Sequence, residues 1–263
     1  MTQLINDEIR QDIMQRLHRV EKDHDVRILL AIESGSRAWG FASPNSDYDV
    51  RFIYVHNKDW YVAVDFEEKR DVIEYPIVDE IDLNGWDVRK ALRLFWKSNP
   101  TFVEWIQSPI IYMESGLFKQ QTLAFLPHLY SVEKGIYHYL SMAKTTYHSY
   151  LRAEYILLKK YFYALRPLLA IRWLEKYQTA APIEFYKLLE LVEDRQILDV
   201  IYELLEKKQN SEELALAPAL PELTQFIESE LIRFESMTPI KMERDANMAQ
   251  LNQLFHTILN EQA

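Results

Sequence analysis

The spacing of hydrophobic positions changes along this chain, and the change falls near residue 114. Before it, short apolar runs at 26–32 and 50–55 are typical of buried strands. Weaker runs predict a hairpin over 61–66 and 72–75, and a further strand over 77–83. Beyond residue 114, apolar positions recur every three or four residues, which predicts helices. We therefore expect an α+β fold, with a small mixed sheet flanked by helices and then an all-helical region.

This change of pattern predicts two domains, residues 1–113 and 114–263. In the second domain, the segment from Val132 to Lys176 is long enough for two helices. Ser211 to Pro221 carries little periodicity and is the best candidate for a linker.

Composition narrows the class of protein. The chain has 263 residues, 48% hydrophobic and 27% charged, without cysteine, which excludes disulfides and thiol catalysis. It contains neither an apolar run of about 18 residues nor a signal-peptide pattern, so we expect a cytoplasmic protein with no membrane partner. A net charge of −10 argues against unspecific coating of nucleic acids but leaves room for a local basic groove.

The strongest chemical signal is a turn at Gly35-Ser36 followed by Asp47-Tyr48-Asp49. On a strand, Asp47 and Asp49 point to the same face, and paired carboxylates suit Mg²⁺ or Mn²⁺. A glycine turn supplies backbone N–H groups for phosphate, so Gly35, Ser36 and the adjacent Arg37 are candidate triphosphate contacts.

A two-metal site of this kind usually takes a third carboxylate from a neighbouring strand. Glu80 and Asp82 both qualify, because strand alternation puts them on one face. We prefer Asp82, which is expected at the end of the 77–83 strand, just before a turn at Asn84-Gly85.

Together, these motifs resemble the signature of the DNA polymerase β-like nucleotidyltransferase superfamily. The run from Gly35 to Arg51 is similar to one branch of it, the RNA-ligase-associated or RNA-repair nucleotidyltransferases. Further similarity lies in the segments Ile81–Asp87, Lys97–Pro100, Glu104-Trp105 and Tyr163–Leu169, so the resemblance covers roughly residues 30–190.

The resemblance implies that residues 1–113 form a catalytic domain and 114–263 a helical domain. It implies transfer of a nucleoside monophosphate from a nucleoside triphosphate to an acceptor hydroxyl, with release of pyrophosphate. Asp47, Asp49 and Asp82 match the catalytic metal ligands, Asp82 also matches the acceptor-activating base, and Ser36 matches the phosphate contact.

The helical half contains a candidate basic face. If residues 148–166 form one helix, steps of three and four residues align six side chains: His148, Arg152, Tyr155, Lys159, Tyr163 and Arg166. Residues 132–176 carry eight Lys and Arg against three Glu, a local net charge of +5. We expect Lys159, Tyr163 and Arg166 to bind the triphosphate and stack its base. The alternative is a solvated face whose tyrosine rings are buried.

The sequence leaves the acceptor open. An RNA 3′ end is favoured by the basic face and the resemblance, whereas the acidic chain as a whole argues the other way. A protein hydroxyl, as in AMP-transferring antitoxins, and a small molecule are alternatives within the same chemistry. A non-catalytic module that binds nucleotide or RNA is the alternative from another class.

Overall fold

The computed structural model describes residues 5–238 and 246–261, and they form two compact units. The sheet unit holds residues 5–38, 47–129 and 246–261, and the helical unit holds 39–46 and 130–238. The units thus interleave along the chain, whereas the predicted domains 1–113 and 114–263 are consecutive; that functional division stays a prediction.

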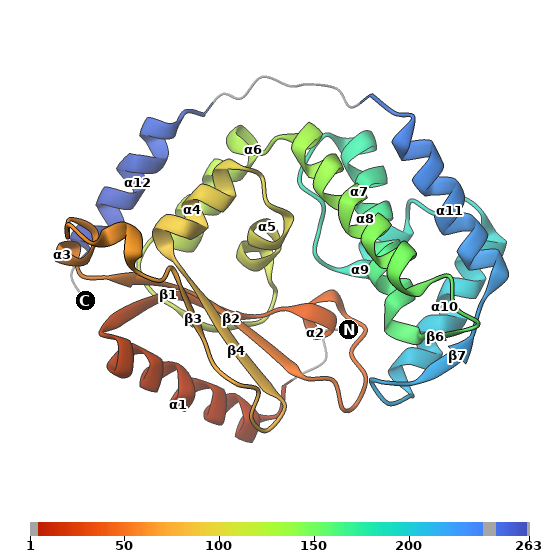
Figure 1. Ribbon diagram of the computed structural model, residues 1–263, viewed down its shortest axis with the longest axis horizontal. Coiled ribbons are helices and arrows are strands. Elements are labelled where there is room, and N and C mark those ends of the chain that lie inside the picture. The colour runs from red at the N-terminus through yellow and green to blue at the C-terminus, as the bar shows by residue number, and fades with distance from the viewer. Residues whose placement is uncertain (1–4, 239–245, 262–263) are drawn as a thin grey trace. The chain divides into compact units, whose positions relative to one another are not determined.

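Five strands form the mixed sheet of the sheet unit, in the order β3-β4-β2-β1-β5 (Figure 1). They are β1 Val26–Glu33, β2 Tyr48–His56, β3 Val72–Glu74, β4 Ile81–Asp87 and β5 Ile111–Glu114. The pair β2 and β4 is parallel, and the other pairs are antiparallel. A mixed sheet with many helices confirms the predicted α+β class.

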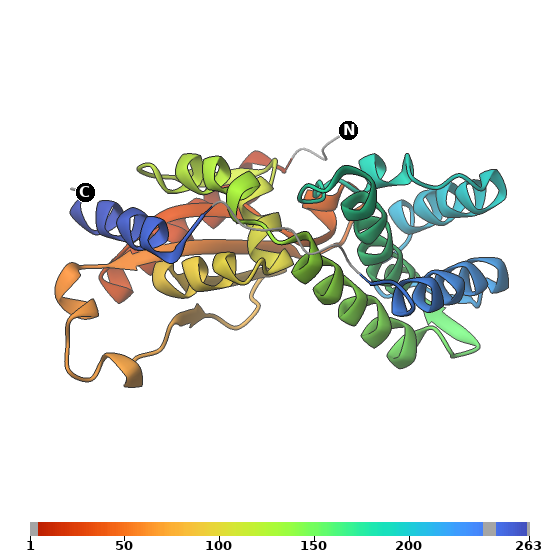
Figure 2. The ribbon, with the colours of Figure 1, turned by 90° about the horizontal axis from the view of Figure 1, so that it is seen from above.

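Helices cover both faces of this sheet. They are α1 Asp7–His24, α2 Gly35–Trp39, α3 Lys58–Tyr61, α4 Val88–Trp96, α5 Pro100–Gln107, α6 Phe118–Leu129 and α12 Met248–Asn260, with a 3₁₀ turn at Phe66–Glu68. Figure 1 shows α1 on one face and α4 on the other, and Figures 1 and 2 both show α12 beside α4. Buried Ile13, Leu17 and Val20 of α1 pack against the sheet.

Side-chain caps fix where several helices begin. Asn6 caps α1, Asp87 caps α4 and Asn99 caps α5, where Pro100 takes the first helical position. Because Asp87 is the last residue of β4 and also the cap of α4, the strand passes directly into the helix.

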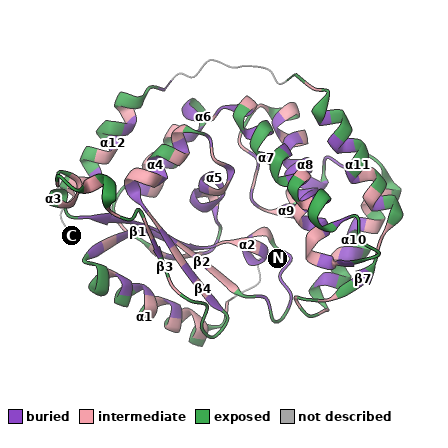
Figure 3. Cartoon of the chain, viewed as in Figure 1, coloured by how far each residue is buried: buried purple, intermediate pink, exposed green. Residues whose placement is uncertain are grey.

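The helical unit contains α7 Val132–Tyr150, α8 Leu158–Tyr177, α9 Phe185–Leu189, α10 Arg195–Gln209 and α11 Pro221–Glu235. Its helices bury their inner faces, as the colouring of Figure 3 shows. The two helices expected between Val132 and Lys176 are therefore confirmed. Residues 39–46 pack into this unit, with the rings of Phe41 and Phe162 stacked at 4.7 Å. No helix in the described ranges is both long and apolar enough to cross a bilayer.

Two strand predictions in the sheet unit are wrong. Residues 61–66 and 72–75 form no hairpin, because β3 pairs with β4 and the preceding segment contains α3. The strand expected at 77–83 begins only at Ile81, since Asp79 and Glu80 have φ of 54° and 62°, outside the strand region. Asp82 therefore lies near the start of β4, and Asn84-Gly85 is inside the strand rather than in a turn.

Two predictions in the helical unit are also wrong. Residues 148–166 are not one helix, because β6 (Tyr155–Leu157) separates α7 from α8. The expected linker at 211–221 contains β7 (Leu216–Pro218), which pairs with β6. Both errors have one cause, which is that this small sheet joins segments about 60 residues apart in the sequence and has no local signal.

Candidate active site

Two carboxylates lie side by side across β2 and β4. The parallel register pairs Asp49 with Asp82, and both side chains are about one-third exposed. One nitrogen of the Arg51 guanidinium donates to both carboxylates, at 2.8 Å to Asp49 and 2.7 Å to Asp82. Its other terminal nitrogen donates to the carbonyl of Asp82 at 2.8 Å. The pair thus shares one cation.

This geometry tests whether the implied divalent metal fits. Arg51 shows that a positive charge can lie at bonding distance from both carboxylates, so the donor set of Asp49 and Asp82 suits Mg²⁺ or Mn²⁺. Among residues 5–238 and 246–261, no group of three or more His, Asp or Glu is placed to hold a metal. Asp47 is exposed and lies just before β2. The three predicted ligands are therefore not assembled as one cluster.

The structure separates the two candidates for the third acid. Asp82 is in register with Asp49, whereas Glu80 lies before the strand, where its carbonyl accepts the Tyr48 N–H at 2.7 Å. The preference for Asp82 rested on a strand end that does not exist, and the parallel register of β2 and β4 is what brings Asp82 beside Asp49.

The predicted Gly35-Ser36 turn is the first turn of α2 and lies directly against Asp49. Gly35 has φ +58°, and a Cβ there would lie 2.0 Å from an Asp49 carboxylate oxygen, so only glycine fits. The Ser34 N–H donates to the Asp49 carbonyl at 2.9 Å, which fixes the turn to β2. Ser36 and Arg37 are buried, and the Arg37 guanidinium lies 4.0 Å from the centroid of the Tyr48 ring. Turn and carboxylate pair therefore form one constellation.

A residue that was not predicted from the sequence supports both the Gly35-Ser36 segment and the carboxylate pair. Glu33, the last residue of β1, is fully buried; its carboxylate accepts the Asp49 N–H at 2.9 Å and the Tyr112 hydroxyl at 2.5 Å. Burial raises the pKa of Glu33 to about 7, against the opposing effect of these hydrogen bonds. The available signal was an acid directly after the apolar run 28–32.

The predicted triphosphate contacts of the helical half all lie in the helical unit. Lys159 pairs with Glu213 at 3.2 Å, and Tyr163 meets the Trp39 ring edge-on. Arg166 is 2% exposed and lies 4.6 Å from the centroid of the Trp39 ring. These three residues share α8, whereas His148, Arg152 and Tyr155 do not. Their role in binding triphosphate stays a prediction.

Comparison with known proteins gives three findings. The profile of a family described as the RNA repair pathway DNA polymerase beta family matches residues 9–257. The uncharacterized protein YcgL of Bacillus subtilis (strain 168) is 43% identical over 255 residues, which cover 96% of this chain and 97% of that protein. A solved nucleotidyltransferase-like protein from Exiguobacterium sibiricum 255-15 has 15% identity and a TM-score of 0.32, over 85% of this chain and 73% of its own. The family match spans both the carboxylate pair and the helical unit.

Proposed function

The chain belongs to the RNA repair pathway DNA polymerase beta family, and on this premise we propose that it is a metal-dependent nucleotidyltransferase. It transfers a nucleoside monophosphate from a nucleoside triphosphate to an acceptor hydroxyl. The acceptor oxygen forms a bond to the α-phosphorus, the bond from that phosphorus to the leaving pyrophosphate breaks, and the hydroxyl proton passes to a carboxylate.

One observation carries this proposal, the Asp49–Asp82 pair that shares a single cation. Clustered carboxylates repel a triphosphate unless positive charge lies between them. A divalent Mg²⁺ or Mn²⁺ held there would neutralise the triphosphate and stabilise charge on the attacking and leaving oxygens. Asp47, one residue before β2, is the proposed additional ligand.

The neighbouring residues of the chain have separate tasks in this proposal. The turn at Gly35-Ser36 offers its backbone and hydroxyl groups to the terminal phosphates, and Arg37 adds positive charge. Asp82 accepts the proton of the acceptor hydroxyl. The Glu33 carboxylate holds Asp49 in place by accepting the backbone N–H of Asp49. Lys159, Tyr163 and Arg166 are the proposed contacts from the helical unit.

An RNA end is the acceptor that we propose. The description of the family, which names an RNA repair pathway, favours RNA, and so does the local charge of +5 over residues 132–176. A protein hydroxyl or a small molecule would use the same residues for the transfer, so the choice among acceptors is made by experiment.

The test supplies each of the four labelled nucleoside triphosphates, Mg²⁺ or Mn²⁺, and either pooled RNA or a protein extract. We expect label in RNA with the wild type, and a loss of at least about 100-fold in Asp49→Asn, because a ligand oxygen and its charge are removed. Asp59→Asn is the matched control, since Asp59 is an exposed acid of α3 in the same unit.

Each other outcome has a definite meaning. Label in protein replaces the RNA acceptor with a protein hydroxyl. Label that survives both Asp49→Asn and a chelator would overturn the carboxylate mechanism. Triphosphate binding without transfer to any fraction would favour a non-catalytic nucleotide-binding module.

A further inference from the structure

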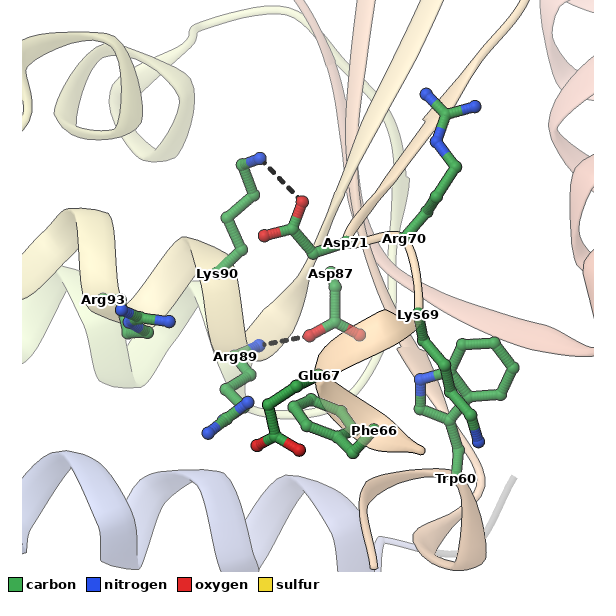
Figure 4. A pocket seen from close by; sticks show the side chains of 10 residues that line it. All are labelled: Trp60, Phe66, Glu67, Lys69, Arg70, Asp71, Asp87, Arg89, Lys90 and Arg93. Carbon is green, nitrogen blue, oxygen red and sulfur yellow. Dashed lines mark hydrogen bonds and ion pairs between the residues drawn. The ribbon is translucent and has the colours of Figure 1, made fainter. Parts of the chain in front are cut away.

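A pocket with a cationic lining lies at the far end of β4 from Asp82. It has a volume of about 160 Å³, and α4 forms one of its walls (Figure 4). Five of its lining residues are cations: Lys69, Arg70, Arg89, Lys90 and Arg93. We call it the basic pocket. Nothing in the proposed transfer reaction uses these residues.

Most of the acids near the basic pocket already have a partner. Three of its cations are paired, at 2.8–3.3 Å, as Lys69–Asp65, Arg70–Glu74 and Lys90–Asp71. The buried Asp87 carboxylate accepts the Tyr61 hydroxyl at 2.6 Å and the backbone N–H of Arg89 at 2.7 Å. Arg89 and Arg93 make no ion pair with any described residue. The lining also contains Glu67, whose carboxylate faces Arg89 (Figure 4), so Arg93 is the lining cation whose charge is left for a ligand.

Aromatic rings help to hold two of these cations in position, and one of the two, Lys69, is also paired with Asp65. The Arg89 guanidinium lies 4.3 Å from the centroid of Phe66, and the Lys69 ammonium lies 4.3 Å from the centroid of Trp60 (Figure 4). A ring attracts a cation without cancelling its charge. This packing orders both side chains, and for Arg89 it does so without an ion pair to any described residue.

The positive charge continues along α4. Arg89, Arg93 and Lys97 are four residues apart, so they share one face of the helix, and we call them the basic track. No acid lies within α4, and its C-cap is Lys97. Arg93 and Lys97 are exposed and make no ion pair with any described residue. A row of free cations is notable in a chain whose net charge is −10.

Folding does not account for the basic track. The opposite face of α4 carries its buried contacts, which are Val88, Ala91, Leu92 and Phe95. Like charges at four-residue spacing repel one another, whereas Arg93 in the last turn and Lys97 at the C-cap interact favourably with the helix dipole. These two effects are of similar size and opposite sign, so neither explains a row of three cations, which an anion would bind.

We propose that the basic pocket and the basic track bind consecutive phosphates of an RNA strand, the acceptor of the transfer reaction. The inference rests on the proposed function for the identity of the strand. A polyanion with regularly spaced charges matches a row of cations one helical turn apart. The planar guanidinium groups of Arg89 and Arg93 suit phosphate oxygens, which they can bind with two hydrogen bonds.

The sheet sets the distance between this site and the carboxylate pair. Asp82 and Asp87 are five residues apart on β4, about 17 Å along the strand. At about 3.4 Å per nucleotide of a stacked strand, this distance corresponds to roughly five nucleotides. Strands shorter than this cannot reach both places, so transfer, rather than binding, should require an acceptor of about this length.

The experiment measures binding of a labelled 12-nucleotide single-stranded RNA at several salt concentrations, with EDTA and without triphosphate. We expect Arg93→Gln/Lys97→Gln to bind roughly tenfold more weakly than the wild type at low salt. The slope of log affinity against log salt should fall by about 1.4, since each lost phosphate contact removes about 0.7 for a single strand. The control Lys22→Gln/Lys207→Gln makes the same charge change at two exposed lysines elsewhere.

The outcomes separate this inference from the proposed function. If the track variant binds like the wild type, or if the control loses as much affinity, the site is wrong even where transfer to RNA is observed. An acidic peptide of equal charge that binds as tightly as RNA would also overturn it. Asp49→Asn should bind RNA normally, so loss of transfer in that variant with intact binding leaves the site supported.

Discussion

At the residue scale, Arg51 decides how two carboxylates can lie next to each other. Asp49 and Asp82 would repel one another, and the guanidinium that bonds to both relieves that repulsion. A divalent cation would need the same oxygens. In the proposed reaction, Arg51 and the metal would therefore compete, and Arg51 would have to move aside for the metal to bind.

This competition predicts the behaviour of Arg51→Gln. Without the guanidinium, Mn²⁺ should bind about tenfold more tightly in the absence of triphosphate, because charged hydrogen bonds worth about 1.5 kcal/mol no longer oppose it. Titration of Mn²⁺, followed by electron paramagnetic resonance of the free ion, measures the affinity. Arg70→Gln, which removes an exposed pair with Glu74, should leave it unchanged. Equal or weaker Mn²⁺ binding in Arg51→Gln would show that the two do not compete.

At the scale of elements, the parallel contact of β2 and β4 builds the site, and one glycine permits it. Gly85 of β4 lies opposite Phe52 of β2 in the register, and a Cβ at Gly85 would lie 2.1 Å from the Phe52 ring. The glycine therefore lets the aromatic ring fill the space over β4. Any shift of β4 to relieve a clash there would also move Asp82.

Gly85→Ala should consequently lower the free energy of unfolding by about 1–3 kcal/mol, the usual cost of overpacking a core. Urea unfolding gives the value. Asn84→Ala, at the neighbouring half-buried position, should change it by less than about 0.5 kcal/mol. Adding Phe52→Leu to Gly85→Ala should recover part of the loss; if it recovers nothing, the ring contact is not the cause.

At the scale of the whole molecule, the candidate motif is divided between two units. The chain leaves the sheet unit after Ala38, packs residues 39–46 into the helical unit, and returns at Asp47. Fully buried Lys208 ties this loop down, with its ammonium 2.5 Å from the Ser43 hydroxyl and 2.6 Å from the Glu213 carboxylate. The Ser46 hydroxyl donates to the same carboxylate at 2.6 Å.

Removing the Lys208 charge should destabilise the helical unit selectively. For Lys208→Met we expect a loss of about 3 kcal/mol, because one partner of a buried ion pair disappears. Hydrogen exchange should show lost protection in α10 and residues 39–46, while β1 and β2 keep theirs. The adjacent, exposed Lys207→Met should have little effect. Uniform loss of protection in both units would mean that they unfold as one.

Local patterns predicted the elements whose signals are contained in a few neighbouring residues. The buried strands at 26–32 and 50–55 and the two long helices between Val132 and Lys176 all depend on adjacent residues. The turn expected at Gly35-Ser36 is instead the first turn of the short helix α2. The errors at 61–83 and 148–221 concern short strands, whose pairing depends on partners distant in the sequence. Glu33 escaped notice for a related reason, since its partners Asp49 and Tyr112 come from other strands.

The sequence by itself determined the class of fold, the likeness to a nucleotidyltransferase family and the types of residue that carry the chemistry. These follow from spacing and residue type, which are properties of the chain. Only the tertiary structure decided that Asp82 lies beside Asp49, that Arg51 shares both carboxylates, and that Arg89, Arg93 and Lys97 make no ion pair with any described residue. The physical reason is that strand register and ion pairing depend on which segments meet in space, and no local pattern encodes that meeting.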